Sequence, residues 1–384
     1  MLSRSLETTL KRQAAFFPVI AATGPRQSGK TTLVRHVFAG KPYISLEDPT
    51  ERAFAQEDPR GFLARFTDGA IFDEAQRWPE LFSYLQGLVD KDRSPGRFVL
   101  TGSQQFGLLS GITQSLAGRV GMNTLLPLGY SEIPAGRSAT LSLDELMLRG
   151  SYPELHTSEV PTRDWMASYV ATYLERDVRQ VLNVQDLSVF ARFLRLCAGR
   201  TGQLLKISSL ADETGVSQST ARVWLSVLEA SYVVHLLQPY HRNFGKRLVK
   251  TPKLYFLDTG LAAWLLGIYT AGQLATHPAR GALFETWVVS EALKSRYHAG
   301  LPSDLYFWRD NNGVEADLMF ETAQGLQTVE IKSGQTVTPD SIRAGLRSKR
   351  MAGDEALTPW LVHGGADSYE RGGVNVMGWR TLAF

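Results

Sequence analysis

Short apolar runs recur through the first third of the chain, and each of them ends at a polar or glycine-rich turn. Residues 18–22 (PVIAA), 70–72 (AIF) and 98–100 (FVL) are apolar enough to predict buried strands. Residues 30–38 instead carry apolar side chains at the three- and four-residue spacing of a helix. Strands that alternate with helices in this way predict an α/β fold.

The middle of the chain has a helical pattern. Apolar positions recur at helical spacing through residues 160–196, with charges on the other faces. Residues 207–215 (ISSLADETG) and 217–232 predict two helices joined by a glycine turn, which is helix-turn-helix spacing. Two apolar strands follow at 232–237 and 253–258, so this segment has the pattern of a winged helix.

The C-terminal third returns to a mixed pattern. Residues 280–296 predict an amphipathic helix, residues 306–321 a hairpin that turns at 310–313, and residues 327–334 a further strand.

A phosphate-binding loop stands between the first strand and the first of these helices. The stretch GPRQSGKT fits G-x-x-x-x-G-K-[ST], the P-loop, whose glycines let backbone N–H groups point at phosphate oxygens. Lys30 is expected to reach the β- and γ-phosphates, and Thr31 to bind Mg²⁺. The expected ATP-binding residues are Gly24, Pro25, Arg26, Gln27, Ser28, Gly29, Lys30, Thr31 and Thr32.

Acidic and polar residues follow the next two strands. Asp73 and Glu74 stand at the carboxyl end of strand 70–72, the edge where ligands bind in parallel sheets. We expect Asp73 to hold Mg²⁺ through water and Glu74 to polarise the attacking water. Ser103 or Gln104, after strand 98–100, is expected near the γ-phosphate or that water.

An arginine in the stretch SLAGRV is a candidate arginine finger. Arg119 lies between small residues, near where we expect the γ-phosphate edge, and would act in its own subunit or in a neighbouring one. The alternative interpretation is an ordinary surface arginine.

Composition limits the choice of class. A length of 384 residues predicts two or three domains, and 43% hydrophobic residues are ordinary for a globular protein. No apolar run approaches 18 residues, and the N-terminus leaves no room for a cleavable signal, so we expect no membrane span. The single cysteine, Cys197, excludes disulfides and cysteine zinc sites within one chain and favours a cytoplasmic location. A net charge of +3 is too small to identify a partner.

The winged-helix pattern carries polar and basic candidates for DNA contact. Gln218, Ser219, Thr220 and Arg222 would face a DNA groove or backbone. The hairpin between the two strands is basic and contains no acid, so it would contact phosphates. Its basic residues are His241, Arg242, Lys246, Arg247, Lys250 and Lys253. The alternative is that the winged helix only packs against the ATPase lid or links subunits.

Acids and a lysine align in the C-terminal third. Glu285 lies on the predicted helix, Asp317 in the hairpin, and Glu330 and Lys332 in one strand, on the same face. This set suits a Mg²⁺-dependent phosphodiesterase in which Asp317 and Glu330 hold the metal and Lys332 orients or activates the water. The alternatives are an inactive relic of such a fold, or an α/β domain with surface charges.

Taken together, these motifs resemble those of prokaryotic AAA+-type ATPases that join a P-loop ATPase to a winged helix and a C-terminal domain of unknown function. That last domain is similar to restriction-endonuclease-like, or PD-(D/E)xK, folds. The stretches GPRQSGKTTL, AIFDEAQ, KLYFLDTGL, GALFETWVV and VEIKSG carry the resemblance, which covers nearly the whole chain.

The resemblance implies an α/β protein in four parts. It places the P-loop AAA+-type ATPase domain at 1–135, an all-α lid at 136–200, the winged helix at 201–270 and the nuclease-like α/β domain at 271–384. It further implies binding and hydrolysis of ATP with Mg²⁺, assembly into a homo-oligomeric ring, taken as a hexamer, and DNA as partner. A sensor arginine in the lid would be Arg176, Arg179 or Arg200.

Three functions remain open. The leading hypothesis is an ATP-hydrolysing motor or remodeller that acts on branched or duplex DNA. The second is an ATP-gated, Mg²⁺-dependent DNA nuclease. The third is a nucleotide-dependent switch that binds a partner protein and has no activity on DNA.

Overall fold

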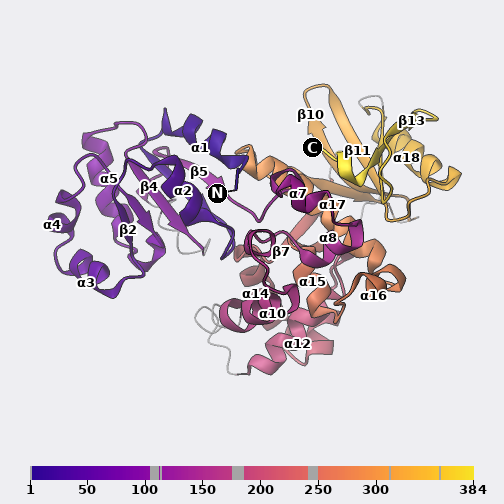
Figure 1. Cartoon of the computed structure of the whole chain (residues 1–384), viewed down its shortest axis with the longest axis horizontal. Helices are drawn as coiled ribbons and strands as arrows, with labels where there is room; N and C mark the ends of the chain where they lie inside the picture. The colour runs from indigo at the N-terminus through magenta and orange to yellow at the C-terminus, as the bar shows by residue number, and fades with distance from the viewer. Residues whose placement is uncertain are drawn as a thin grey trace. The chain divides into compact units, whose positions relative to one another are not determined.

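The computed structural model of this chain falls into two compact units (Figure 1). It describes residues 2–103, 112, 115–174, 186–240, 250–310, 313–353 and 356–384. The first unit comprises Met1–Ile133, Ala230–Tyr232 and Arg296–Pro302, and the second comprises Pro134–Glu229, Val233–Ser295 and Ser303–Phe384.

A five-stranded parallel sheet forms the centre of the first unit, in the order β2-β3-β4-β1-β5. Its strands are β1 (Val19–Thr23), β2 (Tyr43–Ser45), β3 (Ile71–Asp73), β4 (Phe98–Gly102) and β5 (Val120–Thr124). The predicted strands at 18–22, 70–72 and 98–100 are confirmed within a residue or two. Because all five strands are parallel, their carboxyl ends meet at one edge of the sheet.

Helices cover both faces of this sheet. Side chains of β1 alternate between two apolar clusters, with Val19 and Ala21 on one face and Ile20 and Ala22 on the other. The second of these faces packs against α1 (Leu6–Ala14) and α2 (Lys30–Val37), and the first against aromatic and aliphatic side chains of the segment that follows β2. That segment contains α3 (Pro49–Glu57), α4 (Pro59–Ala64), η1 (Ala75–Arg77) and α5 (Leu81–Lys91). Burial on both faces explains why these strands read as continuous apolar runs.

The second unit begins with short helices. They are α7 (Ala135–Ser138), α8 (Leu143–Arg149), α9 (Glu154–Thr157) and α10 (Thr162–Tyr169), which continues into a π-helical turn, η3 (Val170–Leu174). Later come α15 (Thr259–Leu265), α16 (Ala271–Thr276) and the long α17 (Arg280–His298). No helix in the described ranges is both long and apolar enough to cross a membrane.

The segment with the winged-helix pattern forms the predicted elements. In chain order they are α12 (Leu187–Ala198), β6 (Gln203–Leu204), α13 (Ile207–Thr214), α14 (Gln218–Ala230), β7 (Val234–Pro239) and β8 (Lys253–Phe256). The apolar face of α14 is buried, and the Trp224 ring meets those of Phe190 and Phe193 edge-on, each at 5.3 Å. Strand β8 lies between β7 and β6 and pairs antiparallel with both.

This small sheet continues into the C-terminal strands. The nine-stranded order is β13-β14-β12-β11-β10-β9-β7-β8-β6, because β9 pairs in parallel with β7. The C-terminal strands are β9 (Tyr306–Arg309), β10 (Glu315–Thr322), β11 (Gly325–Lys332), β12 (Trp360–His363), β13 (Tyr369–Arg371) and β14 (Val374–Gly378). Helix α18 (Pro339–Ala352) packs against β11 and β12.

The predicted parts at 136–200, 201–270 and 271–384 are therefore not separate compact bodies. Apart from Ala230–Tyr232 and Arg296–Pro302, all three fall within the second unit, and the last two share one sheet. Pairing with β9 satisfies the backbone groups that β7 would otherwise expose as an edge strand. Such pairing between distant segments leaves no mark in the local pattern from which the boundaries were predicted.

Candidate nucleotide site and C-terminal carboxylate cluster

The P-loop has the backbone that its glycines allow. Gly24 to Gly29 connect β1 to α2, and Lys30, Thr31 and Thr32 begin that helix. Gly24 has φ 144° and Gly29 has φ 91°, a region that favours glycine. A Cβ atom on Gly24 would lie 2.1 Å from the carbonyl oxygen of Leu125, so a larger residue does not fit there.

The polar groups of this loop suit a phosphate ligand. Lys30 is buried, and its Nζ donates to the carbonyl oxygens of Gly24 at 3.0 Å and Pro25 at 2.8 Å. The Ser28 hydroxyl is buried without a hydrogen-bond partner among the described residues. An ammonium group, an unsatisfied hydroxyl and the N-terminus of α2 thus converge, so the residues fit a nucleotide phosphate.

Asp73 lies at the centre of a set of hydroxyl groups. It accepts hydrogen bonds from Thr31 Oγ1 at 3.0 Å, from Tyr43 OH at 2.7 Å and from Thr101 Oγ1. Burial, reinforced by Asp73, raises the pKa of Tyr43 above its ordinary value, so the phenol stays protonated and donates. A carboxylate held beside the P-loop threonine fits the expected site for Mg²⁺ on ATP, where Thr31 and Asp73 would hold the ion.

Two of the three donors to Asp73 escaped the sequence analysis. Thr101 lies near the end of β4, the strand beside β3, just before the predicted site residues Ser103 and Gln104. Its position in the sequence was therefore a usable signal. Tyr43 belongs to β2 at the other side of β3. Only the strand order brings Tyr43 to Asp73.

Glu74 lies beside Asp73 at the same edge. Its backbone is left-handed, with φ 53°, which is uncommon for a residue with a side chain and recurs at functional sites. Its carboxylate accepts a hydrogen bond from Ser103 Oγ at 3.1 Å and another from the Gln76 amide. Ser103 therefore lies beside the predicted water-polarising acid, and Gln104 lies outside the described residues.

Arg119 is at the opposite edge of the sheet from the P-loop. It directly precedes β5, which runs parallel to β1, so roughly 16 Å of strand separate it from the loop edge. Its guanidinium pairs with Asp90, with Nε 2.6 Å from Oδ1. The expectation that Arg119 lies near the γ-phosphate of its own domain is wrong, because a residue before a parallel strand lies at the amino edge. A role toward a neighbouring subunit stays a prediction.

The predicted sensor and DNA-contact residues are placed only in part. Arg176, Arg179, Arg242, Lys246 and Arg247 lie outside the described residues, and Arg200 pairs with Glu213 at 2.5 Å. Gln218, Ser219 and Arg222 are exposed on α14, and Lys250 is exposed before β8. Thr220 is half-buried, and its backbone N–H donates to Ser217 Oγ at 3.1 Å, which caps the helix.

Lys253, which the sequence analysis counted in the basic hairpin, has a different environment. It is only 3% exposed, and its Nζ lies 2.8 Å from Glu285 Oε1 and also pairs with Glu315. Strand β8 thus directs Lys253 into the C-terminal acids and not toward solvent. Its assignment as a surface phosphate contact is wrong, because one basic residue of a hairpin can lie on the buried side of its strand.

The acids predicted from the C-terminal third do come together. Burial and, after it, the charge of Asp317 on β10 raise the pKa of Glu285 on α17 and of Glu330 on β11, so both acids lie close to Asp317. Lys332 Nζ lies 2.6 Å from Glu330 Oε1 and 3.9 Å from Asp317 Oδ2. Asp317 Oδ2 also accepts the backbone N–H of Ile331 at 2.8 Å.

Further residues belong to this carboxylate cluster. Tyr255 OH donates to Glu285 Oε1 at 2.5 Å, and Arg309 pairs with Glu315 at 3.2 Å. An open cleft of about 410 Å³ adjoins the cluster. Its lining residues are Gly202, Gln203, Leu204, Lys253, Glu285, Arg309, Glu315 and Asp317.

Burial and like charge perturb the acids. Burial, together with the charge of Asp317, raises the pKa of Glu330 to about 7, against the opposing effect of Lys332. Burial likewise raises the pKa of Glu285. Burial alone would lower the pKa of Lys253, but the surrounding carboxylates raise it, so Lys253 is a cation at neutral pH.

Lysine and arginine side chains already pair with several acids of the predicted metal site. Within the described ranges, no three His, Cys, Asp or Glu side chains are arranged to hold a metal ion. Instead, lysine or arginine groups pair with the acids that would serve as ligands. Asp317 and Glu330 are paired with Lys332, whereas Lys253 holds Glu285 and Glu315, so a metal at Asp317 and Glu330 stays a prediction.

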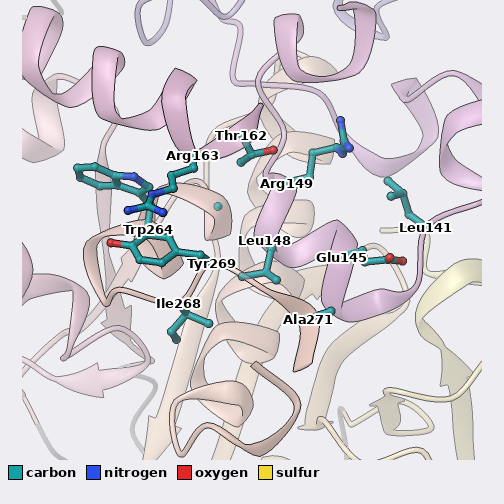
Figure 2. Close-up of a pocket in the computed structure, with 11 residues that line it drawn as sticks. Leu141, Glu145, Leu148, Arg149, Thr162, Arg163, Trp264, Ile268, Tyr269 and Ala271 are labelled. Atoms are coloured by element: carbon teal, nitrogen blue, oxygen red, sulfur yellow. The ribbon is translucent and has the colours of Figure 1, made fainter. Parts of the chain in front are cut away.

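A separate pocket of about 200 Å³ lies elsewhere in the second unit. Figure 2 shows Trp264, Arg163 and Tyr269 gathered at one end of it, and Glu145, Arg149 and Leu141 toward the other. The Arg163 guanidinium stacks 4.6 Å from the centre of the Tyr269 ring. None of the predicted site residues lines this pocket.

Models of three known families match successive parts of the chain. An AAA domain matches residues 17–134, the domain of unknown function DUF8612 matches residues 140–271, and the domain of unknown function DUF4143 matches residues 280–382. The AAA match covers the five-stranded sheet and the P-loop site. The first boundary, at 134–140, agrees with the end of the first unit at Ile133.

Relatives and solved structures extend this comparison. Uncharacterised proteins of Mycobacterium tuberculosis (strain ATCC 25618 / H37Rv) and Mycobacterium bovis (strain ATCC BAA-935 / AF2122/97) are each 37% identical over 351 residues. Each match covers 90% of this chain and 76% of the relative. The Walker-type ATPase of Pyrococcus abyssi is 16% identical and covers 68% of this chain and 94% of its own, with a TM-score of 0.47. That score is too low for a comparison of sites. The chain belongs to the same family as the two mycobacterial proteins, and its N-terminal part is an AAA+-type P-loop ATPase domain.

Proposed function

We propose that this protein hydrolyses ATP to act on branched or duplex DNA, as a motor or remodeller. The nucleotide site supports the ATPase part of the proposal. Lys30, the Ser28 hydroxyl and the α2 N-terminus suit the phosphates, Thr31 and Asp73 suit Mg²⁺, and Glu74 with Ser103 suits the attacking water.

The observation that supports DNA as the partner is the element order of the middle segment. A helix, a strand, two helices and a hairpin succeed one another from α12 to β8, and the three strands form one small sheet. This element order is similar to that of a winged helix, which supports the proposal. Its second helix of the pair, α14, buries Trp224 and Leu225 and exposes Gln218, Ser219 and Arg222. Those side chains are of the kinds that contact base edges and phosphates.

The proposal also includes a contact through which one subunit acts on the ATP of its neighbour. We propose a homo-oligomeric ring, taken as a hexamer, in which the half-buried Arg119 of one subunit is offered to the ATP of the next. In that arrangement Arg119 would exchange its ion pair with Asp90 for the phosphates of ATP.

The test is ATP hydrolysis with and without duplex, forked and four-way DNA, at low and moderate salt. We expect one DNA form to stimulate hydrolysis by the wild type and not by Lys30→Ala. Arg222→Gln should keep the basal rate and lose most of the stimulation, and the matched control Arg195→Gln, an exposed arginine of α12, should keep both. A rate that does not respond to any DNA would refute the DNA part and favour a nucleotide-dependent switch that binds a protein.

A further inference from the structure

The carboxylate cluster of the second unit contains a lysine whose side chain is buried. Lys253 is 3% exposed and stands on β8, the strand enclosed between β7 and β6. Its ammonium also lies over the face of the Phe307 ring, 5.6 Å from the ring centre. A buried lysine is retained only when its charge is matched.

The charge of Lys253 is matched by acids from two other elements. Glu285 Oε1 on α17 lies 2.8 Å from Nζ, and Glu315 on β10 pairs with the same group. Lys332 differs, because it is 47% exposed and can turn toward solvent. Lys253 is thus the fixed cation of the cluster, and Lys332 is the movable one.

Divalent metals and this fixed ammonium compete for the same oxygens. Mg²⁺ and Mn²⁺ bind carboxylate oxygens at about 2.0–2.2 Å and need a surplus of negative charge. Here Glu285 and Glu315 already surround Lys253, and Arg309 adds a second cation at Glu315. A metal at these acids would lie beside the positive charge of a side chain that is only 3% exposed.

We infer that Lys253 is a built-in cation of the carboxylate cluster, seated beside Glu285 and Glu315 where a divalent metal would otherwise bind. Lys253, Lys332 and Arg309 pair with the acids and leave little surplus negative charge for a metal, and the inference implies that the second unit lacks metal-dependent phosphodiesterase activity. This inference does not depend on the proposed ATP-driven action on DNA, which can fail or succeed independently.

The experiment is a Mn²⁺ titration of the full-length chain, followed by the electron paramagnetic resonance signal of free Mn²⁺. Every protein carries Asp73→Asn, so that the nucleotide site does not contribute. We expect no Mn²⁺ binding by the chain with Lys253 intact. Lys253→Met should gain one site, about tenfold or more tighter than any binding by the parent, and adding Asp317→Asn should remove it. The matched control Lys206→Met, an exposed lysine before α13, should behave like the parent.

Thermal unfolding in the same buffers supplies a second measurement, because a metal that binds only the folded state raises its stability. Mn²⁺ should raise the Tm of Lys253→Met and leave that of the parent unchanged. If Lys253→Met is unfolded without metal, Mn²⁺ should restore its fold. Mn²⁺ binding by the parent that Asp317→Asn abolishes would overturn the inference. So would a Lys253→Met variant that gains neither Mn²⁺ binding nor Mn²⁺-dependent stability.

Discussion

Tyr43→Phe removes one hydroxyl from the nucleotide site and leaves the ring in place. Tyr43 OH donates to Asp73 Oδ2 at 2.7 Å, and Thr31 and Thr101 supply the other donors. A hydrogen bond to a charged group contributes about 1.5–3 kcal/mol net. Tyr43 is half-buried, so the lower value applies, and about 1.5 kcal/mol corresponds to roughly a tenfold change in an equilibrium constant. We expect Asp73 to be less well oriented and apparent Mg²⁺ affinity to fall by about tenfold.

ATP hydrolysis as a function of free Mg²⁺, at saturating ATP, measures this effect. The matched control is Tyr84→Phe, which removes the hydroxyl of a tyrosine on α5 that is 36% exposed and stacks beside Trp78. Tyr84→Phe should leave the Mg²⁺ dependence unchanged. If Tyr43→Phe and Tyr84→Phe require the same Mg²⁺ concentration as the wild type, the hydroxyl of Tyr43 does not orient Asp73 in the working enzyme.

Three further predictions concern the first unit. Gly24→Ala should weaken the binding of a fluorescent ATP analogue by about a hundredfold or more, because both its backbone angle and the nearby carbonyl exclude a Cβ atom. Glu74→Gln should bind that analogue normally but hydrolyse ATP at least about a hundredfold more slowly, and hydrolysis at the wild-type rate would contradict its assigned role. Glu132 lies buried between Arg4 and His298, so Glu132→Gln should lower the free energy of unfolding by about 3–5 kcal/mol at pH 7, measured in urea. Burial alone would raise the pKa of Glu132, but His298 and Arg4 hold it below its ordinary value of 4.5. The stabilisation by Glu132 is therefore present above about pH 4.5 and is lost as the pH falls further, and equal unfolding curves for variant and wild type at pH 7 would refute it.

Local signals predicted which residues gather at the candidate nucleotide site. The P-loop is eight successive residues whose glycines need a particular backbone, and both Gly24 and Gly29 have it. Asp73 and Glu74 follow an apolar run, and the carboxyl ends of parallel strands share an edge. The same rule corrects Arg119, because it stands before its strand and so lies at the other edge.

Residues that reach a site across the sheet were harder to predict. Tyr43 donates to Asp73 only because β2 pairs with β3, and nothing in the sequence around Tyr43 states that pairing. Lys253 and Glu285 are 32 residues apart and belong to a strand and a helix that were assigned to different domains. The pairing of β7 with β9 likewise joins the two predicted domains, because it makes their strands one sheet.

The sequence by itself thus determined the element types, the phosphate-binding loop and the set of C-terminal acids, because these depend on side-chain period and local backbone geometry. The tertiary structure decided which charges face one another. The basic residues around Lys253 in the sequence predict that it lies at the surface. Its position on β8 instead buries it beside Glu285. The physical reason is that strand order and register are set by pairing between distant segments, and a buried charge takes its partners from all the elements packed around it.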